Sequence, residues 1–284
     1  MLIKFLNLLF YSNAWIALAA ACSVWQTLLF ISEAPFSDNL PILVFTFTST
    51  LFIYALHRIE GLKKVKNFQG KGRYLVISSF KSHITIYAIL GGLSSFVSFL
   101  FLNWNTQIAL LLPAILSLGY VLPALNKKRR LRDLHFIKIF LIAIVWTWVG
   151  VLLPVLEVGF PIDERVIWLL LERFCFIFAI TLPFDIRDLE IDRHTKVKTI
   201  PALLGAKKSK LLALASLGLL LLCCWMNVWE ELYRVHHFLL FALHAFFTAI
   251  IIYFTHKDRH DYYFTGILDG TIIFQFLLLG LSKL

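Results

Sequence analysis

The chain has 284 residues, of which 60% are hydrophobic and only 15% are charged, and its mean hydropathy is +0.80. Because a soluble domain carries about 25% charged residues, this composition excludes an ordinary water-soluble protein. The formal net charge is +10, but the bases are spread over separate connections. We therefore expect membrane lipid and phosphorylated partners rather than nucleic acid, and nothing in the sequence indicates a protein partner.

Apolar stretches long enough to cross a bilayer recur from one end of the chain to the other. We expect about nine transmembrane helices, near residues 11–31, 40–57, 82–102, 106–125, 136–156, 165–184, 209–228, 237–255 and 264–282. No linker or change of composition divides them. The sequence therefore predicts an all-α, polytopic membrane bundle that forms a single domain over residues 1–284.

The connections between the predicted spans alternate in charge. The even-numbered connections, at 58–81, 127–138 and 187–210, are rich in Lys and Arg, whereas the first, third, fifth and seventh are not. Since Lys and Arg concentrate in cytoplasmic loops, we expect the N-terminus inside and the C-terminus outside. Short connections without an organelle address favour a bacterial cytoplasmic membrane.

Three aspartates follow the sixth apolar run. At about 100° per residue, Asp185, Asp188 and Asp192 fall on a narrow arc of one helix face. They repel one another, and each would cost roughly 2.5–3.5 kcal/mol at the bilayer centre. A hard divalent cation with oxygen ligands would neutralise them. The alternative is a solvated acidic helix end.

Bases and a turn come directly after these acids. The segment reads Asp-x-x-Asp-x-Glu-x-Asp-Arg from 185 to 193, then Thr-x-Pro-x-Leu-Leu-Gly from 199 to 205. This arrangement suits a diphosphate, because a carboxylate-bound Mg²⁺ can bridge its oxygens while Lys or Arg neutralises the remaining charge.

These two motifs, in a chain with about nine spans, resemble the UbiA superfamily of intramembrane prenyltransferases. The resemblance implies a helical bundle around a central cavity, and transfer of an isoprenoid chain from a polyprenyl diphosphate to a lipophilic acceptor, aromatic or lipid. It implies that Asp185, Asp188 and Asp192 hold Mg²⁺ and are catalytic. Basic residues of the same segment are candidate diphosphate contacts: Arg187, Arg193, Lys196 and Lys198.

The loop after the fourth span departs slightly from the family pattern, which has a Tyr followed four residues later by Lys. Here Tyr120 is followed by Lys127 and Lys128 at a wider spacing. All three are candidates for substrate binding.

The first Asp-rich motif of the family is missing. Where the second span meets its loop, the resemblance leads us to expect Asn and spaced Asp, but the chain has His57, Arg58 and Glu60. These three are candidate substrate-binding residues. The site could hold one Mg²⁺, use Arg58 as a fixed cation in place of a metal, or hold no metal. A diverged, non-catalytic binder of polyprenyl lipid is the alternative to an enzyme, and a solute transporter is a weaker one.

Ionisable residues also lie inside the predicted spans. Adjacent helical residues do not face each other, so we expect Glu172 and Arg173 to find separate partners on other helices or to reach the outer surface. Asp269 lies near the cytoplasmic entry of the last span and is a candidate for the acidic rim.

Overall fold

The computed structural model describes residues 2–64, 77–123, 130–194 and 197–282. Within these ranges nine spans are long and apolar enough to cross a bilayer. They are Ala14–Ile31, Phe36–Leu62, Lys81–Phe99, Trp104–Val121, Ile137–Glu157, Glu164–Arg187, Ile200–Trp229, Val235–Tyr253 and Tyr263–Leu281. The predicted all-α, multi-pass architecture is confirmed.

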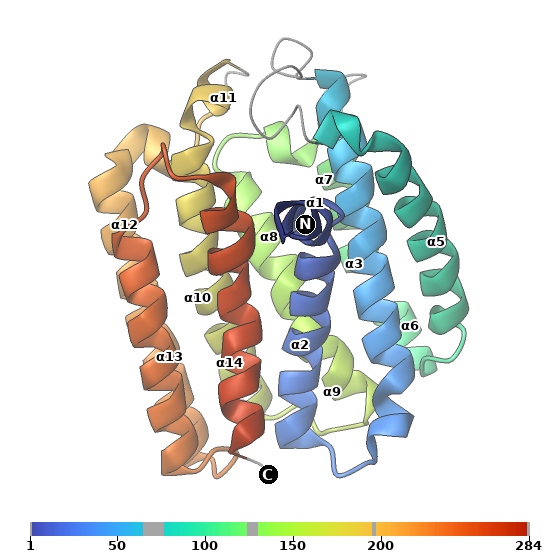
Figure 1. Ribbon diagram of the computed structural model, residues 1–284. Helices are drawn as coiled ribbons and strands as arrows, with labels where there is room; N and C mark the ends of the chain where they lie inside the picture. The colour runs from blue at the N-terminus through green and yellow to red at the C-terminus, as the bar shows by residue number, and fades with distance from the viewer. Residues whose placement is uncertain (1, 65–76, 124–129, 195–196, 283–284) are drawn as a thin grey trace.

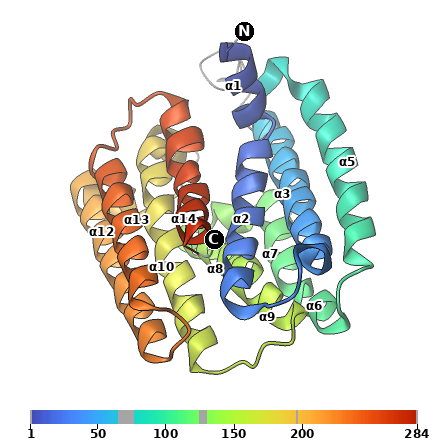
Figure 2. The same ribbon diagram turned by 60° about the horizontal axis from the view of Figure 1, so that its bottom comes forward.

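The elements follow one another as α1 (Leu2–Tyr11), α2 (Ala14–Ile31), α3 (Phe36–Lys64), α5 (Lys81–Phe99), α6 (Trp104–Ala109), α7 (Leu111–Val121), η2 (Leu131–Asp133), α8 (Ile137–Thr147), η3 (Trp148–Leu152), α9 (Leu153–Glu157), α10 (Glu164–Arg187), α11 (Leu189–His194), α12 (Ile200–Trp229), α13 (Val235–Tyr253), η4 (Tyr263–Leu268) and α14 (Asp269–Leu281). The long helices run side by side (Figure 1). Helix α10 packs against α8 and α12, α2 packs against α3 and α14, and α5 lies along α3. The flank formed by α12 and α13 lies opposite the flank formed by α3 and α5 (Figures 1 and 2). We call the end at which α3 and α10 finish and α12 begins the basic end; it is uppermost in Figure 1.

Several helix ends differ from the predicted apolar runs. At the basic end α3 continues to Lys64 and α10 continues to Arg187, because polar residues extend these helices beyond the hydrocarbon region. Helix α12 already begins at Ile200, and a kink at Gly205, with φ 77° and ψ 163°, separates its first residues from the predicted run. The fourth span ends earlier than predicted, at Val121. Leu122 is extended there, with φ −91° and ψ 150°, as expected for a residue that precedes a proline.

Helix α10 has a defined start and a defined break at its end. Asp163 caps its first turn, since the Oδ1 atom accepts a hydrogen bond from the Arg165 backbone N–H at 3.0 Å. At the other end, Asp188 leaves the helix with φ −89° and ψ 5°, and α11 resumes at Leu189. The Asp192 backbone N–H still donates to the Asp188 carbonyl at 2.9 Å, so the interruption is small.

Two spans contain π-helical turns, η3 and η4, in which backbone carbonyls are freed from the α-helical pattern. Side chains of α2 bind a carbonyl in each: the Thr27 hydroxyl donates to Gly150 O at 2.7 Å, and the Trp15 indole donates to Gly266 O at 3.0 Å. These bonds satisfy polar groups that lipid could not solvate. They also hold α2 against both η3 and η4.

Candidate functional site

A cavity of about 350 Å³ lies inside the bundle, and part of its lining comes from residues at the basic end. Toward the basic end this lining includes many ionisable side chains: His57, Arg58, Arg130, Arg132, Asp133, Lys138, Asp185, Arg187, Asp188, Asp192 and Asp261. Deeper in the bundle the lining is mainly apolar, with Ile16, Ile53, Leu116, Leu141, Ile142, Val145, Trp146, Ile177 and Ile180. The cavity therefore has two parts, which we call the charged chamber, toward the basic end, and the apolar chamber, deeper in the bundle. One ligand can occupy both.

Lys138 lies between two of the three predicted aspartates. Its Nζ atom is 2.7 Å from Asp185 Oδ1 and 3.7 Å from Asp192 Oδ2, and the three side chains are between 2% and 7% exposed. Burial raises the pKa of Asp192, the Lys138 ammonium opposes that rise, and Asp188 and Asp185 add to it. The Lys138 ammonium thus favours the ionised form of Asp192.

Backbone contacts hold the start of α8, and with it Lys138, in this position. Phe136 has a left-handed backbone with φ 63°, and its N–H donates to the Lys198 carbonyl at 2.9 Å. The Lys198 N–H in turn donates to His135 Nδ1 at 3.1 Å. These bonds tie the start of α8 to the segment that follows α11.

Arg187 binds the third aspartate. Its Nε and Nη2 atoms donate to the two oxygens of Asp188 at 2.8 and 3.2 Å, and Nη1 donates to Asp261 at 2.9 Å. The guanidinium lies over the rings of Phe184 and Phe264, 5.0 and 5.1 Å from their centroids. Asp188 is therefore held in a fork-shaped charge-assisted pair.

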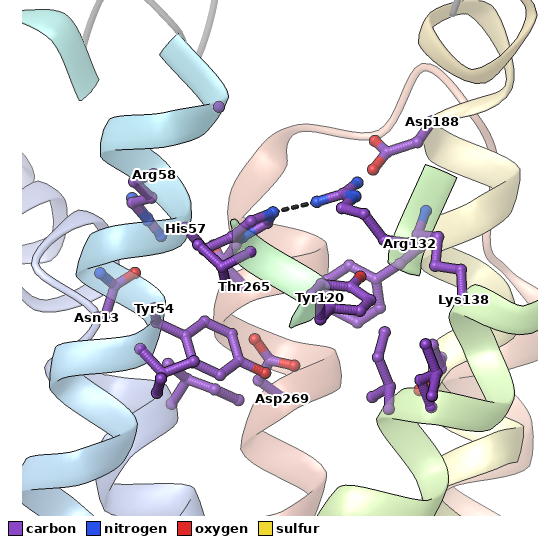
Figure 3. Close-up of a pocket in the computed structure, with 18 of the residues that line it drawn as sticks. Asn13, Tyr54, His57, Arg58, Tyr120, Arg132, Lys138, Asp188, Thr265 and Asp269 are labelled. Atoms are coloured by element: carbon purple, nitrogen blue, oxygen red, sulfur yellow. Dashed lines mark hydrogen bonds between the residues drawn. The ribbon is translucent and has the colours of Figure 1, made fainter. Parts of the chain in front are cut away.

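Arg132 reaches across the chamber toward α3. Its Nη1 atom contacts His57 Nε2, drawn as a dashed line in Figure 3, and its guanidinium lies over the Tyr120 ring at 5.2 Å. The turn that carries it, η2, is held by the ion pair of Arg130 with Asp133 at 2.9 Å. Asp188 and Asp192 interact electrostatically with Arg132 from the opposite side. The guanidinium thus lies between the α3 side and the α10–α11 side of the chamber.

Asp269 and Tyr54 mark the passage from the charged chamber to the apolar chamber. Both line the cavity, and in Figure 3 they lie deeper in the bundle than His57 and Arg132. Their side chains are close enough to interact electrostatically. Asp269 thus joins the cavity wall, deeper than the acidic rim for which the sequence made it a candidate.

The structure brings most of the sequence-predicted residues together. The cavity lining includes seven of them: Asp185, Asp188, Asp192, Arg187, Tyr120, His57 and Arg58. Glu60 is not among the lining residues, and Arg193 and Lys198 are exposed outside it. Lys127, Lys128 and Lys196 lie outside the described residues.

Three bases that shape the chamber were not predicted as site residues: Arg130, Arg132 and Lys138. For Lys138 a signal existed, because it lies inside the fifth apolar run, and an ionisable residue in a span indicates a functional role. Arg130 and Arg132 belong to a basic run whose charge alone predicted topology. Asp261 belongs to no motif that would have indicated it as a site residue.

Comparison with known proteins identifies the family. A model of the UbiA prenyltransferase family matches residues 72–274, well over half of the chain. The chain belongs to the UbiA prenyltransferase family. No curated protein matches it.

Solved structures of UbiA homologues share the fold. A UbiA homologue from Archaeoglobus fulgidus bound to GPP and Mg²⁺ is 13% identical with a TM-score of 0.67, over 96% of this chain and 99% of that one. An apo UbiA homologue from Aeropyrum pernix K1 is 15% identical with a TM-score of 0.66, over 94% and 96%. A structure of digeranylgeranylglyceryl phosphate synthase is 16% identical with a TM-score of 0.63, over 99% and 98%.

The second Asp-rich motif of the UbiA family is present in this chain, but its carboxylates are not arranged around a shared metal position. Among the described residues, no three His, Cys, Asp or Glu side chains are placed to hold one metal ion. A metal ion on Asp185 Oδ1 would have to displace Lys138, and one at Asp188 would have to displace Arg187 from one of the two oxygens. The arrangement therefore does not fit the three-carboxylate metal site that the sequence predicts.

The position of the first Asp-rich motif is also occupied by other interactions. Arg58 donates to the carbonyls of Tyr11 and Phe10 at 2.9 and 3.0 Å, which binds the end of α1 to α3. His57 contacts Arg132. On the α3 side, then, the described lining presents one guanidinium, that of Arg58, and the His57 imidazole where the family pattern has acids.

Proposed function

We propose that this UbiA-family protein transfers an isoprenoid chain from a polyprenyl diphosphate to a lipophilic acceptor, aromatic or lipid, inside the membrane. The observation that carries the proposal is the two-chamber cavity, which joins a charged chamber to an apolar one within the spans. A polyprenyl diphosphate has the same two parts, an anionic head and a hydrocarbon tail.

The head group would bind in the charged chamber. Arg132 offers a planar fork of N–H donors that suits phosphate oxygens, and Arg187 and Lys138 add positive charge nearby. The isoprenoid tail would extend past Tyr54 into the apolar chamber, where its methylene groups lose contact with water or lipid headgroups. We propose that the basic end faces the cytoplasm, since its loops carry most of the Lys and Arg.

In the reaction, the bond between the allylic carbon and the diphosphate oxygen breaks, and the electron pair leaves with the diphosphate. A nucleophilic atom of the acceptor forms a bond to the allylic carbon and loses one proton. Asp269, at the junction of the two chambers, is the carboxylate placed to accept that proton. The products are prenylated acceptor and inorganic diphosphate.

Mg²⁺ at Asp185, Asp188 and Asp192 stays a prediction from the family resemblance. A homologue structure contains Mg²⁺ together with GPP. In this chain the same carboxylates are paired with Lys138 and Arg187, and the proposed bond changes need no metal-bound intermediate.

The test is release of inorganic diphosphate from labelled geranylgeranyl diphosphate by the protein in lipid nanodiscs, with a panel of phenolic and lipid acceptors. We expect prenylated product, and we expect Asp188→Asn to reduce it because Arg187 loses its charged partner. Asp258→Asn is the matched control, since Asp258 is 70% exposed and lies outside the cavity. Absence of both binding and diphosphate release would contradict the proposal.

The altered first motif favours a second candidate, a non-catalytic binder of polyprenyl lipid. The α3 side of the chamber has lost the acids of the family pattern, and His57 and Arg58 are engaged with Arg132 and with α1. Thermal stabilisation by geranylgeranyl diphosphate with no diphosphate release and no product would favour the binder over the enzyme.

A further inference from the structure

We propose that two fixed side-chain cations, Arg132 and Lys138, take the place of divalent metal in this cavity, so that the diphosphate head is bound without a metal ion. The inference rests on the proposed function, because it concerns the head-group chamber of the same cavity.

Lys138 lies between two of the buried acids. Its ammonium lies 2.7 Å from Asp185 and 3.7 Å from Asp192, where a cation shared by these two carboxylates would lie. All three groups are buried, so their charges interact in a medium of low dielectric constant. Lys138, a side chain of α8, therefore neutralises Asp185 and Asp192 in the way that a bound ion neutralises the acids of a metal site.

Arg132 is the second fixed cation of the cavity. Its guanidinium lies between His57 on the α3 side and Asp188 and Asp192 on the other side. On the α3 side the described lining has His57 and Arg58 but no acid. A divalent ion has no carboxylate to bind there, whereas a phosphate oxygen would meet a guanidinium directly.

The loss of acids on the α3 side and the presence of fixed cations in the chamber are physically coupled. In a two-motif site, acids on both sides hold metal ions, and the ions attract the diphosphate. Here the acids on the α3 side are absent, and a basic side chain points into the chamber instead, so the attraction for an anion no longer requires a bound ion. The remaining acids hold the bases: Asp185 and Asp192 hold Lys138, and Asp188 and Asp261 hold Arg187.

The experiment measures binding rather than turnover. Full-length protein in detergent is freed of metal with EDTA, and the dissociation constant for geranylgeranyl thiolodiphosphate, a slowly ionising analogue, is measured by calorimetry in EDTA and in Mg²⁺. We expect the two constants for the wild-type protein to agree within about 3-fold. Wild-type binding at least about 10-fold weaker in EDTA and restored by Mg²⁺ would overturn the inference.

Variants separate the two roles. Arg132→Gln should weaken binding about 10- to 100-fold in both conditions, because a charge-assisted contact to the phosphate is lost. Lys138→Met should create a dependence on metal: binding weak in EDTA and recovered by Mg²⁺, because Asp185 and Asp192 are then available as ligands. Lys210→Met is the matched control, since Lys210 binds the Tyr253 carbonyl outside the cavity and should not change either constant.

The outcomes remain distinguishable from failure of the proposed function. The wild-type comparison in EDTA and Mg²⁺ needs no variant to fold. If the analogue binds in neither condition, the proposed function fails and the inference fails with it. If it binds only with Mg²⁺, the proposed function stands and the fixed-cation inference is overturned.

Discussion

The ammonium of Lys138 lies 2.7 Å from the carboxylate of Asp185, and this ion pair joins α8 to α10 at the charged end of the cavity. Both side chains are almost fully buried. A buried pair of this kind is costly to break, because the remaining partner keeps its charge without compensation. The pair should therefore contribute to the stability of the bundle as well as to its chemistry.

The first prediction concerns that pair. Lys138→Met should lower the free energy of unfolding by about 3–5 kcal/mol, since two carboxylates lose their shared cation. Adding Asp185→Asn should recover part of the loss, with a coupling energy of about 1–3 kcal/mol. The measurement is a double-mutant cycle from unfolding in mixed micelles. Additive effects of the two substitutions would show that the ion pair does not couple the helices.

The second prediction concerns Gly150 in the π-helical turn η3. A Cβ atom there would lie 2.5 Å from Ser23 Oγ, on the face of α2 whose Thr27 donates to the Gly150 carbonyl. Gly150→Ala should therefore lower the stability by about 1–3 kcal/mol. The matched control is Gly218→Ala in α12, where no atom lies within 4 Å of the added Cβ and no loss is expected. Equal melting temperatures of the two variants would contradict the close approach of α2.

The fold could largely be predicted from the sequence because apolar length is a strong signal in lipid. A span needs about 20 apolar residues, and each of the nine runs has its helix in the structure. The separate partners of Glu172 and Arg173 were also expected. Glu172 accepts from the Tyr233 hydroxyl at 3.0 Å, and Arg173 donates to the Ser23 carbonyl at 3.1 Å. Hydrophobic periodicity could not predict the break at Asp188 or the π-helical turns, because these depend on tertiary contacts.

The site was predicted only in part. The spacing of Asp185, Asp188 and Asp192 indicated one helix face, and all three reach the cavity. It could not show which cation contacts them, because Lys138 is separated from Asp185 by nearly all of two spans and the connection between them. Lys138 was interpreted as a topology signal, since a base at the edge of an apolar run has that meaning in most membrane proteins. The position of Arg132 depends on the η2 turn, which sequence patterns do not specify.

The third prediction concerns the far end of α10, where Asp163 caps the helix. The hydrogen bond from the Arg165 side chain lowers the pKa of Asp163 below its ordinary value. A carboxyl whose pKa is lowered by folding stabilises the protein above its unfolded pKa and loses that contribution as the pH falls through the folded pKa. Asp163→Ala should cost about 1 kcal/mol near neutral pH.

Asp163→Asn is the control for that prediction, because an amide oxygen can still cap the helix but carries no charge. The wild-type protein should melt above Asp163→Asn near neutral pH, and the gap should close below about pH 3. A gap that persists at low pH would show that the charge of Asp163 is not its cause.

The fourth prediction concerns Asp269, which lies with Tyr54 where the charged chamber meets the apolar chamber. If its carboxylate accepts the proton that the acceptor loses, Asp269→Asn should lower the single-turnover rate about 100-fold or more. The affinity for geranylgeranyl thiolodiphosphate should stay within about 2-fold of the wild-type value, since in the proposed binding mode the head group lies closer to the basic end. Asp258→Asn serves again as the exposed control. A parallel loss of affinity and rate would assign Asp269 to head-group binding, and an unchanged rate would remove it from the reaction.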